Sequence, residues 1–297
     1  MNKPNTCVDP LIADALANVT NASLQYCIAD TVNANNWTLI SEFTTLDCSA
    51  LGLIDIYGLE QFNALTSLKL YWNNIDDLTP LAGLTSLEQL WLNGNFISDV
   101  SPLGNLSALT ELWLQDNMIT YIHGWNNLPS LTTLNLWTNS MYMLNGLENL
   151  TNLSELDVRF NQLDDLSALS NLTNLSALWA DSNLLTNIAP LANLTSLDRL
   201  SLSFNPISNI APIVTMSGLT RVEFSDTQLN DVTPLASLQG VNILVLSNNP
   251  LVTAVSALEQ LPNAYINLSG SDNIPCAELD SLEAALVNTL ARPASCI

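Results

Sequence analysis

The stretch Leu84-Thr-Ser-Leu87-Glu-Gln-Leu90-Trp-Leu92-Asn-Gly-Asn95-Phe-Ile97 decides the fold, because the same frame returns along most of the chain. Its asparagine recurs every 22 residues, Thr227 replaces it once, and the asparagine then returns one period later. A fixed period of this length predicts a stack of similar coils. The asparagines that share this slot are Asn73, Asn95, Asn117, Asn139, Asn161, Asn183, Asn205 and Asn249.

Each period contains a strand, a turn and a short return segment. In Leu90-Trp91-Leu92 the leucines point inward and the middle residue points outward, as in a strand. The asparagine follows where the chain turns, and its amide can satisfy backbone groups that would otherwise be buried without partners. The return segment contains proline and is too short for a long helix. The pattern LxxLxLxxN therefore predicts an α/β solenoid, a right-handed leucine-rich repeat superhelix with a concave parallel β-sheet and short 3₁₀ or extended convex segments.

The ends of the chain lack the repeat and are predicted to be helical caps. We predict an N-terminal cap over residues 1–42, repeats over residues 43–274 in about eleven coils, and a C-terminal cap over residues 275–297. The first and last coils are degenerate, and the last is read as shifted by one inserted residue. A stripe of Leu279, Leu282, Leu286 and Leu290 predicts one amphipathic helix in the C-terminal cap. Capped stacks of this kind form one continuous domain.

Composition excludes several classes of function. The chain has 28 acidic and 6 basic residues, so its net charge of −22 repels the phosphates of nucleic acid. It has no apolar run long enough to span a membrane, and we predict a monomer. The single histidine, His123, cannot assemble a catalytic triad or a zinc site with a second histidine. We predict no enzyme activity, no cofactor and no metal.

The repeat unit LxxLxxLxLxxNxIxDLxPLxxL resembles the 22-residue class found in bacterial internalins and in SDS22-like phosphatase regulators. The resemblance covers residues 43–274, and the segments around Cys48 and Cys276 resemble the caps of bacterial surface-associated members. Similarity to internalins implies an extracellular or cell-surface bacterial protein that binds another molecule with its concave face. No sorting motif or immunoglobulin-like segment follows the repeats.

All five cysteines lie outside the regular repeats or at their edge, which is typical of cap disulfides in an oxidising compartment. We pair Cys276 with Cys296, which follows a short return. We pair Cys27 with Cys48, because Cys48 points inward from the first strand and Cys27 lies on the helical face that should cover it. Cys7 is then free, and Cys7–Cys27 is the competing pair. The N-terminus has no signal peptide, so the cysteines favour a chain whose leader has been removed over a cytosolic protein.

The outward positions of the strands hold the candidate binding residues. Trp91 and Trp113 fall one period apart and should touch, since neighbouring strands lie about 4.8 Å apart. Arg199 and Arg221 form a basic spot that could receive an acidic group. Trp125 replaces an inward leucine and is predicted to be core, and Phe160 and Phe204 are read as structural. The candidate ligand-binding residues are Tyr71, Trp91, Trp113, Trp137, Trp179, Glu111, Glu155, Asp157, Arg159, Asp181, Arg199 and Arg221.

Grouped tryptophans on outward positions favour a binding surface, because Trp, Tyr and Arg dominate interface energetics. The first hypothesis is therefore a non-enzymatic, secreted or surface-exposed module that recognises a protein through this aromatic and acidic concave face. A carbohydrate-binding adhesin that uses the same tryptophans is an alternative. A second alternative is an intracellular scaffold or phosphatase regulator, which reduced cysteines would support.

Overall fold

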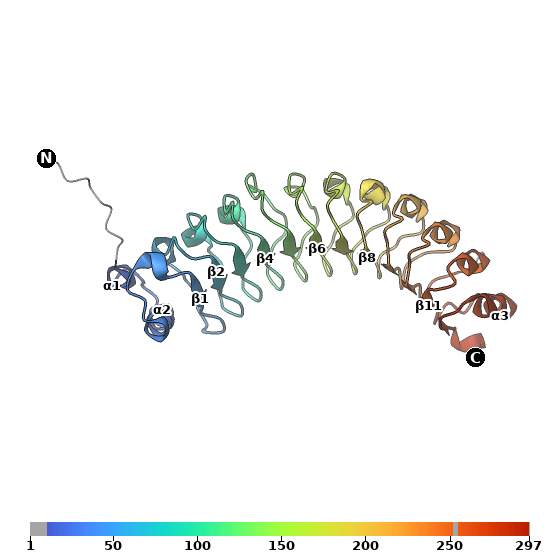
Figure 1. Cartoon of the computed structure of the whole chain (residues 1–297), viewed down its shortest axis with the longest axis horizontal. Helices are drawn as coiled ribbons and strands as arrows, with labels where there is room; N and C mark the ends of the chain where they lie inside the picture. Colours follow the sequence, from blue (N-terminus) through green and yellow to red (C-terminus); the bar gives the residue numbers. More distant parts are fainter. Residues whose placement is uncertain (1–10, 252–254, 297) are drawn as a thin grey trace. The chain divides into compact units, whose positions relative to one another are not determined.

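The computed structural model describes residues 11–251 and 255–296, so Cys7 and its competing pairing lie outside the described residues. The chain forms two compact parts, Met1–Leu131 and Thr132–Ile297. In each part the coils place strands along one side and short helical turns along the other (Figure 1). That the whole array is one continuous domain, with cap and repeat bounds as given above, remains our proposal.

Parallel strands in chain order form the sheet of each part. In the first part β1 pairs with β2, β2 with β3 and β3 with β4. In the second part the pairs run from β5–β6 to β11–β12. The strands are β1 (Thr45–Asp47), β2 (Ser67–Lys69), β3 (Gln89–Trp91), β4 (Glu111–Trp113), β5 (Thr133–Asn135), β6 (Glu155–Asp157), β7 (Ala177–Trp179), β8 (Arg199–Ser201), β9 (Arg221–Glu223), β10 (Ile243–Val245), β11 (Tyr265–Asn267) and β12 (Leu290–Ala291).

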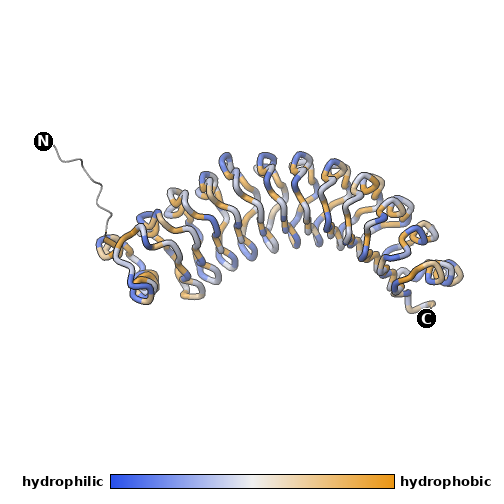
Figure 2. Tube along the Cα trace, in the orientation of Figure 1, coloured by the Kyte–Doolittle hydropathy of each residue, from blue (hydrophilic) through white to orange (hydrophobic). Residues whose placement is uncertain are grey.

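The core of each coil consists of the repeated apolar positions. In the coil of β3 the side chains of Leu84, Leu87, Leu90, Leu92 and Ile97 are fully buried. Figure 2 shows the same alternation of hydrophobic and hydrophilic segments in one coil after another. Because each coil buries its leucines against the next, the stack grows one core without requiring long helices. The leucine-rich repeat solenoid predicted from the period is therefore confirmed.

The asparagines form the predicted type of ladder. The side chain of Asn183 accepts a hydrogen bond from Leu163 N (2.9 Å) and donates to Val158 O (3.0 Å) and Ala180 O (3.1 Å). Each amide thus joins its own turn to the preceding coil. Thr227 cannot accept in the same way, and the N–H of Ile207 bonds to the carbonyl of Asn205 instead. The amide is therefore the group that completes the backbone hydrogen bonding at each turn.

Most return segments are short 3₁₀ helices, as the proline pattern predicts, but the segments between β4 and β5 and between β5 and β6 contain none. Asp77, Asp99, Asp165 and Asp231 each accept a hydrogen bond from the N–H two residues ahead (2.8–2.9 Å), so these carboxylates cap the turns. The 3₁₀ helices are Ile40–Glu42, Leu59–Gln61, Thr79–Leu81, Ser101–Leu103, Ser167–Leu169, Ala189–Asn193, Ala211–Thr215, Thr233–Ser237, Val255–Gln260 and Ala294–Cys296.

Two α-helices, α1 (Ile12–Leu16) and α2 (Ala22–Asn35), precede β1. Helix α2 begins where the side chain of Asn21 accepts from Leu24 N at 3.1 Å, which caps the first turn. The helix buries Leu24 and Ile28. A disulfide joins Cys27 of α2 to Cys48 directly after β1. The helix is thereby fixed over the end of the leucine core.

Helix α3 (Cys276–Ala285) follows β11, and a disulfide joins Cys276 to Cys296. The predicted helical stripe is right for Leu279 and Leu282, which are fully buried. It is wrong beyond them, because Leu286 has an extended backbone and Leu290 lies in β12, paired with β11. The last coil keeps the register of the repeat up to the ladder slot, which Ser271 occupies. The predicted inserted residue follows that slot, because the next buried side chain is Ile274, three positions later, where regular coils bury the residue two positions later. Pairing with the last coil overrides the local helical pattern.

Candidate functional site

In the first part, the sheet face carries Tyr71, Glu111 and two tryptophans. Trp91 ends β3 and Trp113 ends β4, and the two are register partners on neighbouring strands. The ammonium group of Lys69 lies 5.0 Å from the centre of the Trp91 ring, a cation–π distance. Glu111 accepts a hydrogen bond from Gln89 at 3.0 Å. Lys69 and Glu111 therefore already have contacts on this face, whereas the indole Nε1 of Trp113 is buried without a hydrogen-bond partner among the described residues.

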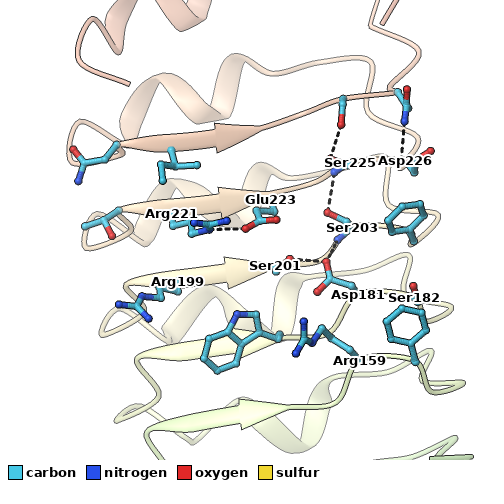
Figure 3. A pocket seen from close by; sticks show the side chains of 18 residues that line it. Arg159, Asp181, Ser182, Arg199, Ser201, Ser203, Arg221, Glu223, Ser225 and Asp226 are labelled. Atoms are coloured by element: carbon cyan, nitrogen blue, oxygen red, sulfur yellow. Dashed lines mark hydrogen bonds and ion pairs between the residues drawn. The ribbon is translucent and has the colours of Figure 1, made fainter. Parts of the chain in front are cut away.

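In the second part, the sheet face is hollowed over β7 to β10. The hollow has a volume of about 1040 Å³ and contains five of the predicted residues, Arg159, Trp179, Asp181, Arg199 and Arg221 (Figure 3). Trp137, Glu155 and Asp157 do not line it. Its other lining groups are Phe160, Ser182, Ser201, Ser203, Phe204, Thr220, Glu223, Ser225, Asp226, Asn242, Ile243, Ser247 and Asn248.

Arg159 is held rigidly at the edge of this hollow. Its guanidinium donates two hydrogen bonds to Asp157, at 3.0 and 2.6 Å, and lies 5.6 Å from the centre of the Trp137 ring. The bonds to Asp157 raise the pKa of Arg159 above its ordinary value. The side chain of Asp157 is only 8% exposed and that of Arg159 is 37% exposed. The two charges therefore form a largely buried, hydrogen-bonded ion pair. Asp157 thus positions Arg159 and does not itself face the hollow.

Arg199 and Arg221 are register partners on β8 and β9, and both are largely exposed. Each lies near an acid from its own strand segment. The Nε of Arg199 is 3.5 Å from Asp198, and the Nε of Arg221 donates to Glu223. Figure 3 shows the two guanidinium groups pointing in different directions along their strands. The predicted basic spot is therefore balanced by acids and is not a concentrated positive patch.

Asp181 is a half-buried charge of the hollow. Its carboxylate accepts from the hydroxyl of Ser201 and from Ser203 N at 2.9 Å. Burial raises the pKa of Asp181, and the hydrogen bonds from Ser201 and Ser203 oppose this rise. Beyond it, the hydroxyls of Ser225 and Ser247 bond to each other at 2.8 Å. A row of serine hydroxyls therefore crosses the floor of the hollow.

We expect Asp181→Asn to stabilise the protein at neutral pH by up to about 1 kcal/mol. The asparagine oxygen still accepts both hydrogen bonds, whereas the half-buried charge is removed. Because the folded-state pKa is raised, the ionised carboxylate destabilises the fold above that pKa, and the cost disappears as the pH falls through it. Urea unfolding at pH 7 and at pH 4 measures the difference. The exposed Asp164→Asn is the matched control, and an equal gain there would show a general charge effect.

The structure also assigns the aromatic residues outside the predicted set. Trp125 is buried and donates from Nε1 to Val100 O at 2.8 Å, so its assignment to the core is confirmed. Phe160 and Phe204, which the sequence analysis reads as structural, are 53% and 57% exposed and line the hollow, and Phe160 also packs edge-on against the Trp137 ring, with ring centres 6.2 Å apart. They stand directly before the ladder asparagines, where the backbone has a positive φ and turns the side chain outward. Comparing this slot between coils would have shown that its occupants vary, as surface residues do.

His123 lies outside both surfaces and is 3.6 Å from the carboxylate of Asp99, in a half-exposed setting. Within residues 11–251 and 255–296, no group of three His, Cys, Asp or Glu side chains is placed to hold a metal ion. No helix in that part of the chain is long and apolar enough to cross a membrane.

The comparisons with known proteins agree with the fold. A family model described as leucine-rich repeats in two copies matches residues 63–105. No curated protein matches the sequence as a relative.

Several solved structures share the architecture. An internalin, InlF, from Listeria monocytogenes is 24% identical, with 97% of this chain and 98% of that chain covered and a TM-score of 0.62. A leucine-rich repeat protein of Leptospira interrogans is 25% identical over 86% of this chain and 73% of that chain, with a TM-score of 0.70. The ectodomain of the plant receptor kinase GASSHO1/SCHENGEN3 from Arabidopsis thaliana, solved in complex with CASPARIAN STRIP INTEGRITY FACTOR 2, is 20% identical. It covers 86% of this chain and 36% of that chain, with a TM-score of 0.62. The repeat, the sheet and these likenesses together show that the chain has the leucine-rich repeat fold and is similar in structure to bacterial internalin-like proteins.

Proposed function

We propose that this protein is a non-enzymatic binding module that recognises a protein partner through the outward face of its sheet. Leucine-rich repeat proteins are typically protein-interaction modules, and the plant ectodomain above was solved with a bound factor. The observation that carries the proposal is the open hollow of about 1040 Å³ over β7 to β10. It combines arginine, tryptophan, phenylalanine and serine on one exposed surface.

The chemistry of the hollow fits a mixed polar and apolar protein surface. Trp179 and Arg159 belong to the residue types that dominate interface energetics. The two half-exposed phenylalanines, Phe160 and Phe204, offer apolar contact along one side, and Arg199 and Arg221 offer donors along the other. Since each arginine has a nearby acid, a partner must present both acidic and basic groups to replace these contacts.

We further propose an extracellular or cell-surface location. The disulfides Cys27–Cys48 and Cys276–Cys296 persist in oxidising compartments and are rare in the cytosol. The structural likeness to a bacterial internalin supports the same location. Disulfides weigh against the intracellular scaffold or phosphatase regulator.

A paired screen tests the proposed function. Three proteins are applied to an array of extracellular protein domains and, separately, to a glycan array: wild type, Trp91→Ala/Trp113→Ala and Trp179→Ser. Serine already occupies the slot of Trp179 one coil later, as Ser201, so this variant keeps a residue that the repeat tolerates. We expect a protein hit that at least one variant weakens by about 30-fold, the loss of a hot-spot residue. Protein hits that all variants retain would place binding elsewhere on the molecule.

The carbohydrate alternative rests on one observation, the row of serine hydroxyls beside Trp179 in the hollow. Sugars stack on tryptophan and exchange hydrogen bonds with hydroxyls. The row is less open to a sugar than its residue types suggest, because Ser201 bonds to Asp181 and Ser225 bonds to Ser247. A glycan hit that Trp179→Ser abolishes would establish this alternative in place of a protein partner.

A further inference from the structure

A second surface lies at the turns that follow β2, β3 and β4. In each coil the residue before the ladder asparagine has a left-handed backbone, with φ of 56° at Trp72, 68° at Gly94 and 56° at Asp116. These three residues are one period apart and therefore occupy the same slot in successive coils. A methyl group added at Gly94 would lie 2.5 Å from Cε3 of the Trp72 indole. The missing side chain at residue 94 thus lets the indole lie across the turn of the next coil.

This arrangement makes a pocket of about 450 Å³. Its lining consists of Trp72, Gly94, Phe96 and Asp116, together with the ladder residues Asn73 and Asn95. The side chains of Trp72 and Phe96 are 58% and 49% exposed, so about half of their apolar surface contributes no burial energy to the fold. An exposed pair of aromatic faces with a carboxylate in the same pocket indicates a site for a ligand.

The charges on this part of the molecule select the ligand. Among the hydrogen bonds and ion pairs of the described residues, none involves the side chain of Asp116. Within residues 11–131, Lys69 is the only lysine or arginine, and its ammonium lies over Trp91 and not over Trp72. No cation from the described part of the chain therefore fills the pocket. The net charge of −22 also draws cations toward the surface and repels a second copy of the chain.

We propose that Trp72, Phe96 and Asp116 bind a basic side chain, lysine or arginine, of a protein partner. The ring faces attract the cation through their quadrupoles, and the carboxylate supplies an opposite charge at short range. Because Gly94 has no side chain, the Trp72 indole can lie against the turn of the next coil, and its exposed face is in place before the ligand binds. The site is separate from the sheet-face residues of the proposed function and does not rest on it.

The seven tryptophans make this site observable in solution. Each indole N–H gives one signal in a ¹⁵N-labelled sample, and the signal of Trp72 is assigned with a Trp72→Ser variant. The probe is the capped peptide Gly-Arg-Gly-Lys-Gly, and its neutral counterpart carries citrulline and norleucine in place of the two basic residues. We expect saturable movement of the Trp72 signal with the basic peptide and roughly 2- to 30-fold weaker binding of the neutral one.

Substitutions by residues that occupy the same slot in other coils distinguish binding in the pocket from attraction by the overall negative charge. Trp72→Ser copies Ser182, and Asp116→Asn copies Asn248, both of which occupy the same left-handed slot in other coils. We expect Trp72→Ser to weaken peptide binding roughly 2- to 30-fold at unchanged net charge. Asp116→Asn should weaken it a few-fold, mostly at low salt. The controls Leu184→Ser, which removes an exposed apolar side chain outside the hollow, and Asp76→Asn should bind as wild type does.

Three results would overturn the proposal. Unchanged binding by folded Trp72→Ser, checked by circular dichroism, would show that the peptide is held by overall charge. A loss of the Trp72 response in Trp91→Ala/Trp113→Ala would place the site on the sheet face. Tight binding of phosphocholine but not of the peptide would assign the pocket to a lipid headgroup. Failure of the sheet-face screen leaves all three readouts unaffected, so the two proposals fail or stand separately.

Discussion

Replacing Asn183 with alanine is expected to cost about 3–5 kcal/mol of the free energy of unfolding. The side chain of Asn183 is 5% exposed and satisfies Leu163 N, Val158 O and Ala180 O. Alanine leaves Leu163 N buried without a partner, which costs about 1–3 kcal/mol. It also removes one of two amide donors from each carbonyl, at about 0.5–1.5 kcal/mol per hydrogen bond, since Val158 O keeps Asn161 and Ala180 O keeps Asn205. Water cannot easily replace the amide, because the surrounding coil positions are filled with leucine. Urea unfolding followed by circular dichroism measures the loss.

Asn187→Ala is the matched control for this prediction. Asn187 is exposed on the return segment of the same coil and makes one capping bond, to Ala189 N at 2.9 Å. Its removal should cost only about 1 kcal/mol. Equal losses in the two variants would contradict the ladder as a source of stability. Thr227→Asn should give the opposite sign, because it restores the amide to the slot that lacks it.

Because a solenoid is coupled only between neighbouring coils, the position of the change also matters. Loss of the Asn183 amide weakens the junction between two coils of the second part. Hydrogen exchange should therefore increase most in the coils of β6, β7 and β8, and least in α2 and β1. Uniform loss of protection along the chain would show that the array unfolds as a single unit.

Removing the disulfide Cys27–Cys48 in a double serine variant is expected to cost about 3 kcal/mol. The bond closes a loop with a sequence separation of 21 residues, and a loop of this length loses about that much entropy from the unfolded chain. The bond also holds α2 over the end of the core, where Leu24 and Ile28 are fully buried. We therefore expect hydrogen exchange in this variant to accelerate, relative to wild type, more at the amides of α2 than at those of β7.

Cys7→Ser is the control for the competing pair. If Cys27 pairs with Cys48, Cys7→Ser leaves the free energy of unfolding unchanged. The unreduced, denatured wild-type protein then contains one free thiol. A loss of about 3 kcal/mol in Cys7→Ser, with none in Cys48→Ser, would establish Cys7–Cys27 instead. Five free thiols in the protein isolated from its native compartment would remove the support for an extracellular location.

The repeat pattern predicted the buried residues of each coil correctly. Leu90, Leu92 and Asn95 recur because every coil meets the same demand, to bury apolar side chains and to satisfy the backbone at a turn. Only a few residue types meet that demand, so the pattern predicts the structure. The C-terminal cap shows where this reasoning ends, since Leu290 continues a helical stripe and still joins β12. At Leu290, hydrogen bonding to the otherwise unpaired edge of β11 stabilises the strand more than the local helical preference stabilises a helix.

The candidate surfaces could be predicted only in part. The outward slots of Trp179, Arg199 and Arg221 followed from the period, and the structure places all three in one hollow. The variable slot that holds Trp72 and Phe204 indicates exposed residues, but the direction of these side chains and the pocket beside Trp72 could not be found from the period. Their side chains leave from a left-handed turn, and their direction depends on what the next coil presents.

The sequence by itself determined the coil, its period, the ladder of asparagines and the residues that face outward from the strands. Tertiary structure alone decided which outward groups share one surface, that Asp157 holds Arg159, and that the Trp72 indole lies across Gly94. The physical reason is that a buried position has few solutions, all repeated from coil to coil. An exposed side chain has many solutions, and its neighbours in adjacent coils select among them.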